Sequence, residues 1–111
     1  MNCIFCKIAN RELPATIVYE DEKVIAFKDI NPIAPIHYLI IPKKHIASIN
    51  QLEPQDRELM GDMLLAAQKI AKKEGIADSG YRLVFNVGRD SGQMVDHLHL
   101  HLLGGKKLSW A

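Results

Sequence analysis

The stretch His97-Leu98-His99-Leu100-His101-Leu102-Leu103 alternates histidine with leucine and decides the fold around it. Successive side chains of a β-strand point to opposite faces, so an extended backbone gathers the three imidazoles on one face and the leucines on the other. The leucine face can be buried against a helix, whereas three histidines at this spacing have no packing role. We therefore expect a strand over residues 95–103 with one apolar face and one histidine face.

The spacing argues against one metal ion held by all three imidazoles. Neighbouring histidines on a strand lie about 7 Å apart and the outer pair about 13 Å, whereas zinc needs each nitrogen at about 2.1 Å. One adjacent pair can converge on an ion, but three cannot. The middle residue, His99, instead suits a nucleophile whose neighbours orient it and bind the charge that it attacks. Imidazole has an ordinary pKa of about 6.5, so much of it is neutral and nucleophilic at pH 7.

The loop before the histidines, Asp90-Ser91-Gly92-Gln93-Met94-Val95, contains a glycine and enters the predicted strand directly. Such a loop can turn backbone N–H groups toward an anion, and Gln93 adds a side-chain amide. Beside three histidines, this combination indicates that the anion is a phosphate.

The remaining elements are short strands and two helices. Asn31-Pro32-Ile33-Ala34-Pro35 is expected to be a rigid loop, because proline fixes φ and removes a donor. We expect a short helix over 4–11, hairpin strands over 17–20 and 24–29, a strand over 37–41, a long helix over 54–74 and a strand over 81–87. Strands in meander order around one long helix favour an α+β fold with an antiparallel sheet.

The long helix carries apolar residues at three- and four-residue steps, which predicts one buried stripe. Pro54 suits its first turn, and Gly75 suits a left-handed cap just beyond its last turn. The stripe consists of Met60, Met63, Leu64, Ala67, Ile70 and Ala71. We interpret its methionines as core packing.

Size and charge exclude several classes of function. A chain of 111 residues and 12.5 kDa predicts a single domain over 1–111. A net charge of +1 gives no electrostatic basis for binding nucleic acid or a membrane surface. No apolar run reaches the roughly 20 residues of a membrane span. Residues 1–7 lack the features of a signal peptide, so we expect a cytoplasmic protein with reduced cysteines.

The histidine stretch resembles the His-φ-His-φ-His-φ-φ signature of the histidine-triad (HIT) family, where φ is apolar. Further segments are similar to the histidine triad nucleotide-binding branch: 4–5, 26–30, 34–37, 41–45, 80–82, 86, 92–93 and 103–105. The resemblance implies an α+β, HIT-like protomer: a five-stranded antiparallel sheet with one long and one short helix. It also implies a homodimer with a continuous ten-stranded sheet, which would cover an exposed sheet edge.

The resemblance implies hydrolysis of a purine nucleoside phosphoramidate without a catalytic metal. His99 would attack the α-phosphorus and form a nucleotidyl-histidine intermediate that water cleaves. His101 would hydrogen-bond the phosphate. His37 would lie close by as a supporting group, and His97 would link the histidines into one network. Two alternatives stay open: a dinucleoside polyphosphate hydrolase, and a nucleotide-binding interaction module with little turnover.

The resemblance also assigns contacts to the nucleotide. Asp29 matches the carboxylate that takes the ribose hydroxyls, and Ile30 would lie beside the base. His99 and His101 would contact the phosphate directly. The other phosphate-side contacts are Asn86, Gly92 and Gln93.

Four further residues are assigned with an alternative or a departure. Phe5 and Phe27 would wall the base pocket, or else simply pack in the core. Met94 stands where this branch usually has serine or threonine, so only its backbone N–H can serve the phosphate. Trp110 looks like the tryptophan of a C-terminal tail that approaches the partner subunit's site, although it would equally cover exposed sheet.

The pair Cys3 and Cys6 forms a Cys-x-x-Cys motif outside the strand–helix–strand context of a redox site. Some histidine-triad relatives with such a pair bind structural zinc through both thiolates and two histidines. His45 and His97 match those positions, which predicts a Cys₂His₂ zinc site. Inert buried thiols and redox chemistry are the alternatives.

Overall fold

The computed structural model describes residues 3–110, so residues 1, 2 and 111 of the expected single domain lie outside the described part. Five strands form one antiparallel sheet in the order β1-β2-β3-β5-β4. The elements are α1 (Ile4–Ala9), β1 (Ile17–Glu20), β2 (Val24–Lys28), β3 (Ile36–Pro42), α2 (Arg57–Lys73), β4 (Tyr81–Phe85) and β5 (Leu100–Gly104), with 3-10 turns at Ile49–Gln51, Pro54–Asp56 and Arg89–Ser91.

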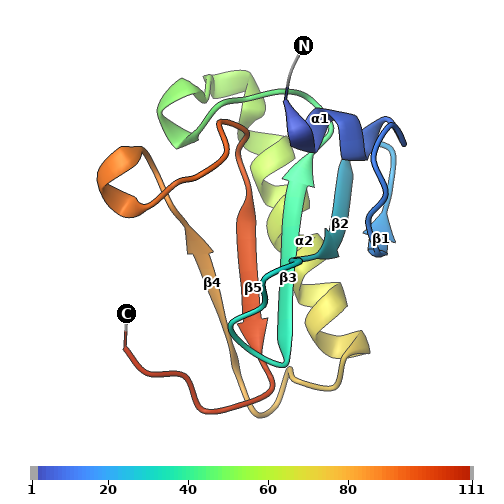
Figure 1. Ribbon diagram of the computed structural model, residues 1–111, viewed down its shortest axis with the longest axis vertical. Coiled ribbons are helices and arrows are strands. Elements are labelled where there is room, and N and C mark those ends of the chain that lie inside the picture. The colour runs from blue at the N-terminus through green and yellow to red at the C-terminus, as the bar shows by residue number, and fades with distance from the viewer. Residues whose placement is uncertain (1–2, 111) are drawn as a thin grey trace.

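The α+β fold with an antiparallel sheet is confirmed, but the strand order is not the expected meander. The chain leaves β3, runs along α2 to β4 at the sheet edge, and returns as β5 between β3 and β4 (Figure 1). The 17 residues of α2 span about 25 Å, which carries the chain past the position next to β3. That position is filled last, so β5 contacts a strand on each side.

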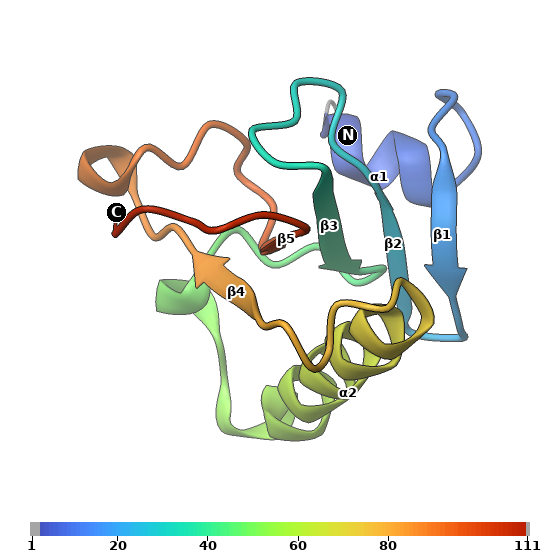
Figure 2. The same cartoon turned by 90° about the horizontal axis from the view of Figure 1, so that it is seen from below.

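The two helices lie on opposite faces of the sheet (Figure 2). The larger core lies under α2, where Leu98, Leu100 and Leu102 pack with Met63 and Ile70. The predicted burial of the leucine face against the long helix is therefore confirmed. The smaller core lies under α1 and consists of Phe5, Ile8, Ile25, Phe27, Leu39 and Ile41.

The strand expected over 95–103 is wrong in its first half, because β5 begins only at Leu100. The pairing of β3 with β5 ends at Ile40↔Leu100; two residues further it would reach Pro42, which has no N–H to donate to the ladder. The N–H of Leu98 bonds instead to the carbonyl of Ile46 at 2.6 Å. His97 and His99 consequently precede β5, and of the three histidines only His101 belongs to it.

Three other element ends differ from the sequence expectation by two residues or more. The first helix stops at Ala9, because Arg11 adopts a left-handed φ of 63°. A 3-10 turn at Pro54–Asp56 precedes α2, and β4 ends at Phe85, two residues before the expected end at 87. Gly75 has the φ of 74° expected of a helix cap. Within residues 3–110 no helix combines the length and hydropathy that crossing a membrane requires.

Candidate active site

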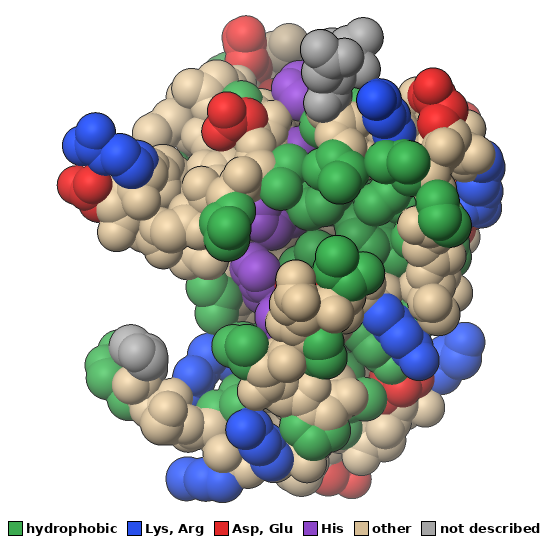
Figure 3. Space-filling model, in the orientation of Figure 1, with side chains coloured by type: hydrophobic (Ala, Val, Ile, Leu, Met, Phe, Trp, Pro, Cys, Tyr) green, Lys and Arg blue, Asp and Glu red, His purple; other side chains and the backbone are tan. Residues whose placement is uncertain are grey.

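A cavity of about 320 Å³ opens on the α1 side of the sheet. Its floor comes from β2, β3 and β5 and its walls from α1 and from the loop between β4 and β5. Figure 3 shows the hollow on this face, with histidine side chains between hydrophobic ones. Its lining is mostly apolar, and its titratable residues are Lys28, Asp29, His99 and His101. Such a cavity suits a flat apolar group with a polar or charged end.

His99 offers one nitrogen to the cavity because the other is fixed. Its Nδ1 donates to the carbonyl of His97 at 2.7 Å, so in the neutral ring Nε2 carries the lone pair. No described residue bonds this Nε2, and no fully buried side-chain nitrogen or oxygen lacks a partner. The atom therefore reaches the molecular surface, as a nucleophile must. The ring of Phe5 contacts His99 edge-on at a centroid distance of 5.2 Å and limits its rotation.

His101 and His37 form a pair of imidazoles beside His99. His37 Nε2 lies 2.9 Å from His101 Nδ1 and 3.3 Å from the Asp29 carboxylate. Burial and the neighbouring His99 and His37 rings lower the pKa of His101 to about 4. Burial also lowers the pKa of His37, and Asp29 opposes that shift. Both rings are consequently neutral at pH 7.

The four expected zinc ligands meet at one end of the sheet. Cys3 Sγ lies 3.2 Å from His97 Nδ1, Cys6 Sγ lies 3.3 Å from His45 Nδ1, and the two Nδ1 atoms are 3.2 Å apart. All four donor atoms lie within 4.8 Å of one another. A zinc tetrahedron with bonds of about 2.0 to 2.3 Å has edges of about 3.3 to 3.8 Å, so the donor set fits zinc.

The orientation of His97 supports the same fit. Its Nε2 donates to the Pro42 carbonyl at 2.8 Å, as the second ring nitrogen of a metal-bound histidine usually does. This bond leaves the Nδ1 lone pair facing the thiols. Burial lowers the pKa of His97 and keeps it in the neutral form that binds metals. Burial and a hydrogen bond with Cys3 raise the pKa of Cys6 to about 11, so ionising the Cys6 thiol calls for a cation.

Most of the expected nucleotide contacts line the cavity. Phe5 and Phe27 pack in the smaller core and also line the cavity. Met94 is 93% exposed at its mouth. Asp29, Ile30, Asn86 and Gly92 complete the expected residues that line it.

Gln93 occupies a different place from the one expected. Its Oε1 accepts from the N–H of Gly88 at 2.8 Å, and its Nε2 donates to the carbonyls of Ala47 and Val95 at 2.8 and 3.0 Å. Every polar group of this side chain is therefore used to hold the loop. The sequence carries no local signal of this role, because the partners are backbone groups, one of them 46 residues away.

Trp110 lines a neighbouring cavity of about 700 Å³, together with His37, His101 and residues of β4. Arg82 Nη1 donates to the Ser109 carbonyl at 2.7 Å and holds the tail beside β4. The tryptophan itself is 90% exposed on this side of the molecule. Its placement leaves an apolar ring next to the edge strand.

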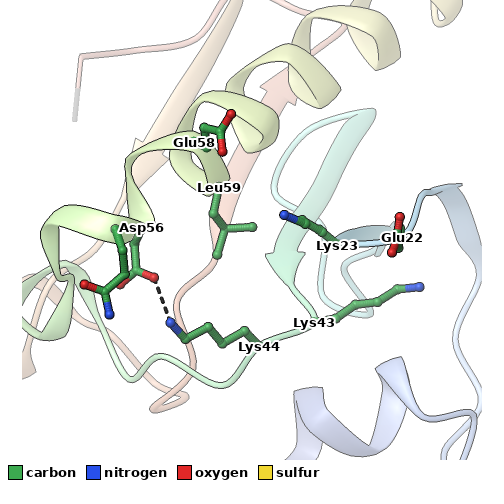
Figure 4. A pocket seen from close by; sticks show the side chains of 8 residues that line it. Glu22, Lys23, Lys43, Lys44, Asp56, Glu58 and Leu59 are labelled. Atoms are coloured by element: carbon green, nitrogen blue, oxygen red, sulfur yellow. Dashed lines mark hydrogen bonds and ion pairs between the residues drawn. The ribbon is translucent and has the colours of Figure 1, made fainter.

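A third hollow, of about 330 Å³, lies between the hairpin turn and the start of α2 (Figure 4). Lysines and carboxylates line it, and Lys44 Nζ donates to Asp56 at 2.8 Å. No imidazole or thiol is among its lining residues. The cavity lined by both His99 and His101 is therefore the candidate active site.

Comparisons with known proteins agree with this geometry. The model of the family described as "Scavenger mRNA decapping enzyme C-term binding" matches residues 2–109. The chain is 50% identical to the purine nucleoside phosphoramidase of Escherichia coli K12 over 105 residues, 95% of this chain and 88% of that protein. An uncharacterised HIT-like protein of Synechocystis is 52% identical over 107 residues, 96% of this chain and 93% of that protein.

Among solved structures, a HIT family hydrolase from Legionella pneumophila superposes with a TM-score of 0.97 at 57% identity, covering 98% of this chain and 97% of that one. The family model spans nearly the whole chain, and the relatives are similar over most of their own length. With the cavity and its histidines, they show that this chain belongs to the histidine-triad family, in the group whose model matches residues 2–109.

Proposed function

We propose that the protein hydrolyses purine nucleoside phosphoramidates, in which a nucleoside monophosphate is joined to an amine. The observation that carries the proposal is the His99 ring, whose Nδ1 is fixed by a backbone carbonyl and whose Nε2 is free at an apolar cavity. The relative in Escherichia coli named as a purine nucleoside phosphoramidase supports the substrate class.

In this proposal the base lies against the pocket wall formed by Phe5 and Phe27, beside Ile30, and the Asp29 carboxylate accepts from the ribose hydroxyls. His99 Nε2 attacks the α-phosphorus, a bond from nitrogen to phosphorus forms, and the bond to the amine breaks. The amine leaves with a proton taken from solvent. Water then cleaves the nucleotidyl-histidine and returns the ring to its neutral form. His101 and the N–H groups near Gly92 and Met94 hold the phosphoryl oxygens.

Turnover of adenosine 5′-phosphoramidate, compared with that of a diadenosine polyphosphate, tests the substrate class. We expect the phosphoramidate to be the better substrate and acid-quenched protein to carry one adenylyl group on His99, seen by mass spectrometry. His99→Ala should lose the adduct and at least about a thousandfold in kcat while still binding AMP. Wild-type protein that binds AMP but turns over neither compound would make it a binding module.

We propose structural zinc at Cys3, Cys6, His45 and His97. The ion would fix His97, whose carbonyl orients the nucleophile, and would take no part in the reaction. Protein purified without chelator should contain about one zinc per chain, and Cys6→Ser should lower both the zinc content and the midpoint temperature of unfolding. Full stability of a zinc-free wild type would contradict a structural role.

We also propose a homodimer formed through the open edge of β4, and a cytoplasmic location. β4 ends the sheet, and Trp110 and Leu83 expose apolar surface beside it. Cys3 and Cys6 lie in a cluster with His45 and His97 and not in a disulfide, which is typical of a reducing compartment.

A further inference from the structure

A chain of hydrogen bonds leads from the loop before β3 to the phosphate-side histidine. The backbone N–H of Ile33 points at His37 Nδ1 with a nitrogen–nitrogen distance of 3.2 Å. His37 Nε2 in turn lies 2.9 Å from His101 Nδ1. The two rings are 5.2 Å apart between centroids.

The first bond fixes the direction of the second. A backbone N–H can only donate, so His37 Nδ1 must carry the lone pair, and the single ring proton of neutral His37 sits on Nε2. That proton is aimed at His101 Nδ1 and at the Asp29 carboxylate, 3.3 Å away, and both are acceptors. The opposite direction would place two N–H donors face to face at Ile33 and a lone pair against a carboxylate.

The direction of the bond from His37 also fixes the tautomer of His101. Because its Nδ1 accepts from His37, the single proton of this neutral ring lies on Nε2. No described residue bonds this Nε2, and since no fully buried side-chain nitrogen within residues 3–110 lacks a partner, it reaches the surface. Its ring lines the cavity beside His99, at a centroid distance of 5.0 Å. His101 thus presents a donor where His99 presents a lone pair.

The same three side chains have the composition of a metal site, since Asp29, His37 and His101 bring their ligand atoms within 4.8 Å of one another. A cation would need the lone pair of His37 Nε2, and the proton would then move to Nδ1, against the N–H of Ile33. The contact at Ile33 therefore favours a hydrogen-bond chain over a cation.

We propose that the backbone amide of Ile33 is a positioning group that sets the direction of this chain and so makes His101 a hydrogen-bond donor to the phosphate. The catalytic part of this inference rests on the proposed hydrolysis. The side chain of Ile33 is 67% exposed, so the core does not require it. What the site uses is the N–H, which the flanking Pro32 and Pro35 cannot supply.

Nitrogen-15 NMR of the imidazoles tests the direction without substrate. In the wild type we expect the Nε2–H tautomer for His37 and His101 and the Nδ1–H tautomer for His99. An Nδ1–H tautomer at His37 overturns the inference, whatever the enzyme hydrolyses. So does a second equivalent of zinc that Asp29→Asn abolishes and Cys6→Ser leaves in place.

Two variants at position 33 test the positioning role. Ile33→Pro removes the N–H, and Ile33→Ala keeps it while removing the exposed side chain. We expect Ile33→Pro to give mixed tautomers at His37 and His101 and a kcat about tenfold lower, with KM within about twofold. Ile33→Ala should match the wild type in tautomer and kcat. Tautomers and kcat both unchanged in Ile33→Pro would overturn the role of this amide. The expected tautomers without turnover in the wild type would contradict the proposed hydrolysis and leave the direction intact.

Discussion

Each histidine of the motif has a ring nitrogen fixed by a hydrogen bond, which is Nε2 in His97 and Nδ1 in His99 and His101. His97 donates from Nε2 to a carbonyl and turns Nδ1 toward the thiols. His99 donates from Nδ1 and frees Nε2. His101 accepts at Nδ1 from His37. In the proposed mechanism, three identical side chains thereby serve as a metal ligand, a nucleophile and a hydrogen-bond donor.

The partly buried, neutral state of His101 makes stability depend on pH. Its pKa is about 4 in the folded protein and about 6.5 in an unfolded chain. Between these values the unfolded chain binds the proton and the native one does not, so the free energy of unfolding falls as pH falls from 6.5 to 4. One pKa unit corresponds to about 1.4 kcal/mol. Because the ring is partly exposed, we expect a loss of about 2 kcal/mol over this range.

Urea unfolding of the wild type and of His101→Asn, measured at several pH values in chelator, checks this. The asparagine oxygen can accept from His37 in place of Nδ1, so the variant should fold, with a shallower dependence on pH. Parallel curves for the two proteins would contradict a lowered pKa at His101.

At the scale of elements, α2 joins the sheet through a stripe narrower than its apolar residues suggest. Met63 is fully buried, whereas Leu64 is 47% exposed, although both belong to the stripe expected from the sequence. Adjacent helical positions point about 100° apart, so one of the two must turn from the sheet. Ala66, which was not part of the expected stripe, is buried instead of Leu64.

This pair gives a matched test of the core. Met63→Ala should lower the free energy of unfolding by about 2 to 5 kcal/mol, because it opens a cavity between helix and sheet. Leu64→Ala should change it by about 0.5 kcal/mol or less. Urea unfolding at pH 7 measures both, and equal losses would contradict the position of α2.

The segment that contains β5 illustrates which features of an element the sequence could predict. Alternation in 97–103 was enough to assign the leucines to the helix and the imidazoles to the other face, because each side-chain direction is a local property. The start of β5 was not predictable in this way, since it depends on Pro42 in another strand, two residues beyond the last pair of β3 with β5.

For the site, the family resemblance supplied the residues that line the cavity, but not their bonds. Gln93 was expected at the phosphate because its amide is a good donor, and only the fold reveals that backbone groups already use it. The role proposed for the amide of Ile33 could not be predicted from the sequence for a related reason. A backbone N–H is present at almost every residue, so no residue type marks the one that matters.

For the whole molecule, the open edge at β4 predicts association. A homodimer has a mass of about 25 kDa, twice the 12.5 kDa of one chain. Leu83 lies on this edge strand and is 37% exposed. Leu83→Asp puts a charge into the expected interface, and we expect it to shift the mass measured by light scattering toward that of the monomer. Leu65→Asp, on the exposed side of α2, is the control and should stay dimeric. A wild type that is monomeric at high concentration would exclude this edge as an interface.

The contact between Cys3 and His97 joins residues 94 positions apart. The ribosome makes His97 after both cysteines and 91 residues after Cys6, so the four donors cannot meet until this whole segment has been synthesised. Closing so long a loop costs more entropy than forming a hairpin. A metal bound there would therefore stabilise only chains that extend to His97, and a chain that stopped before His97 would lack this cross-link.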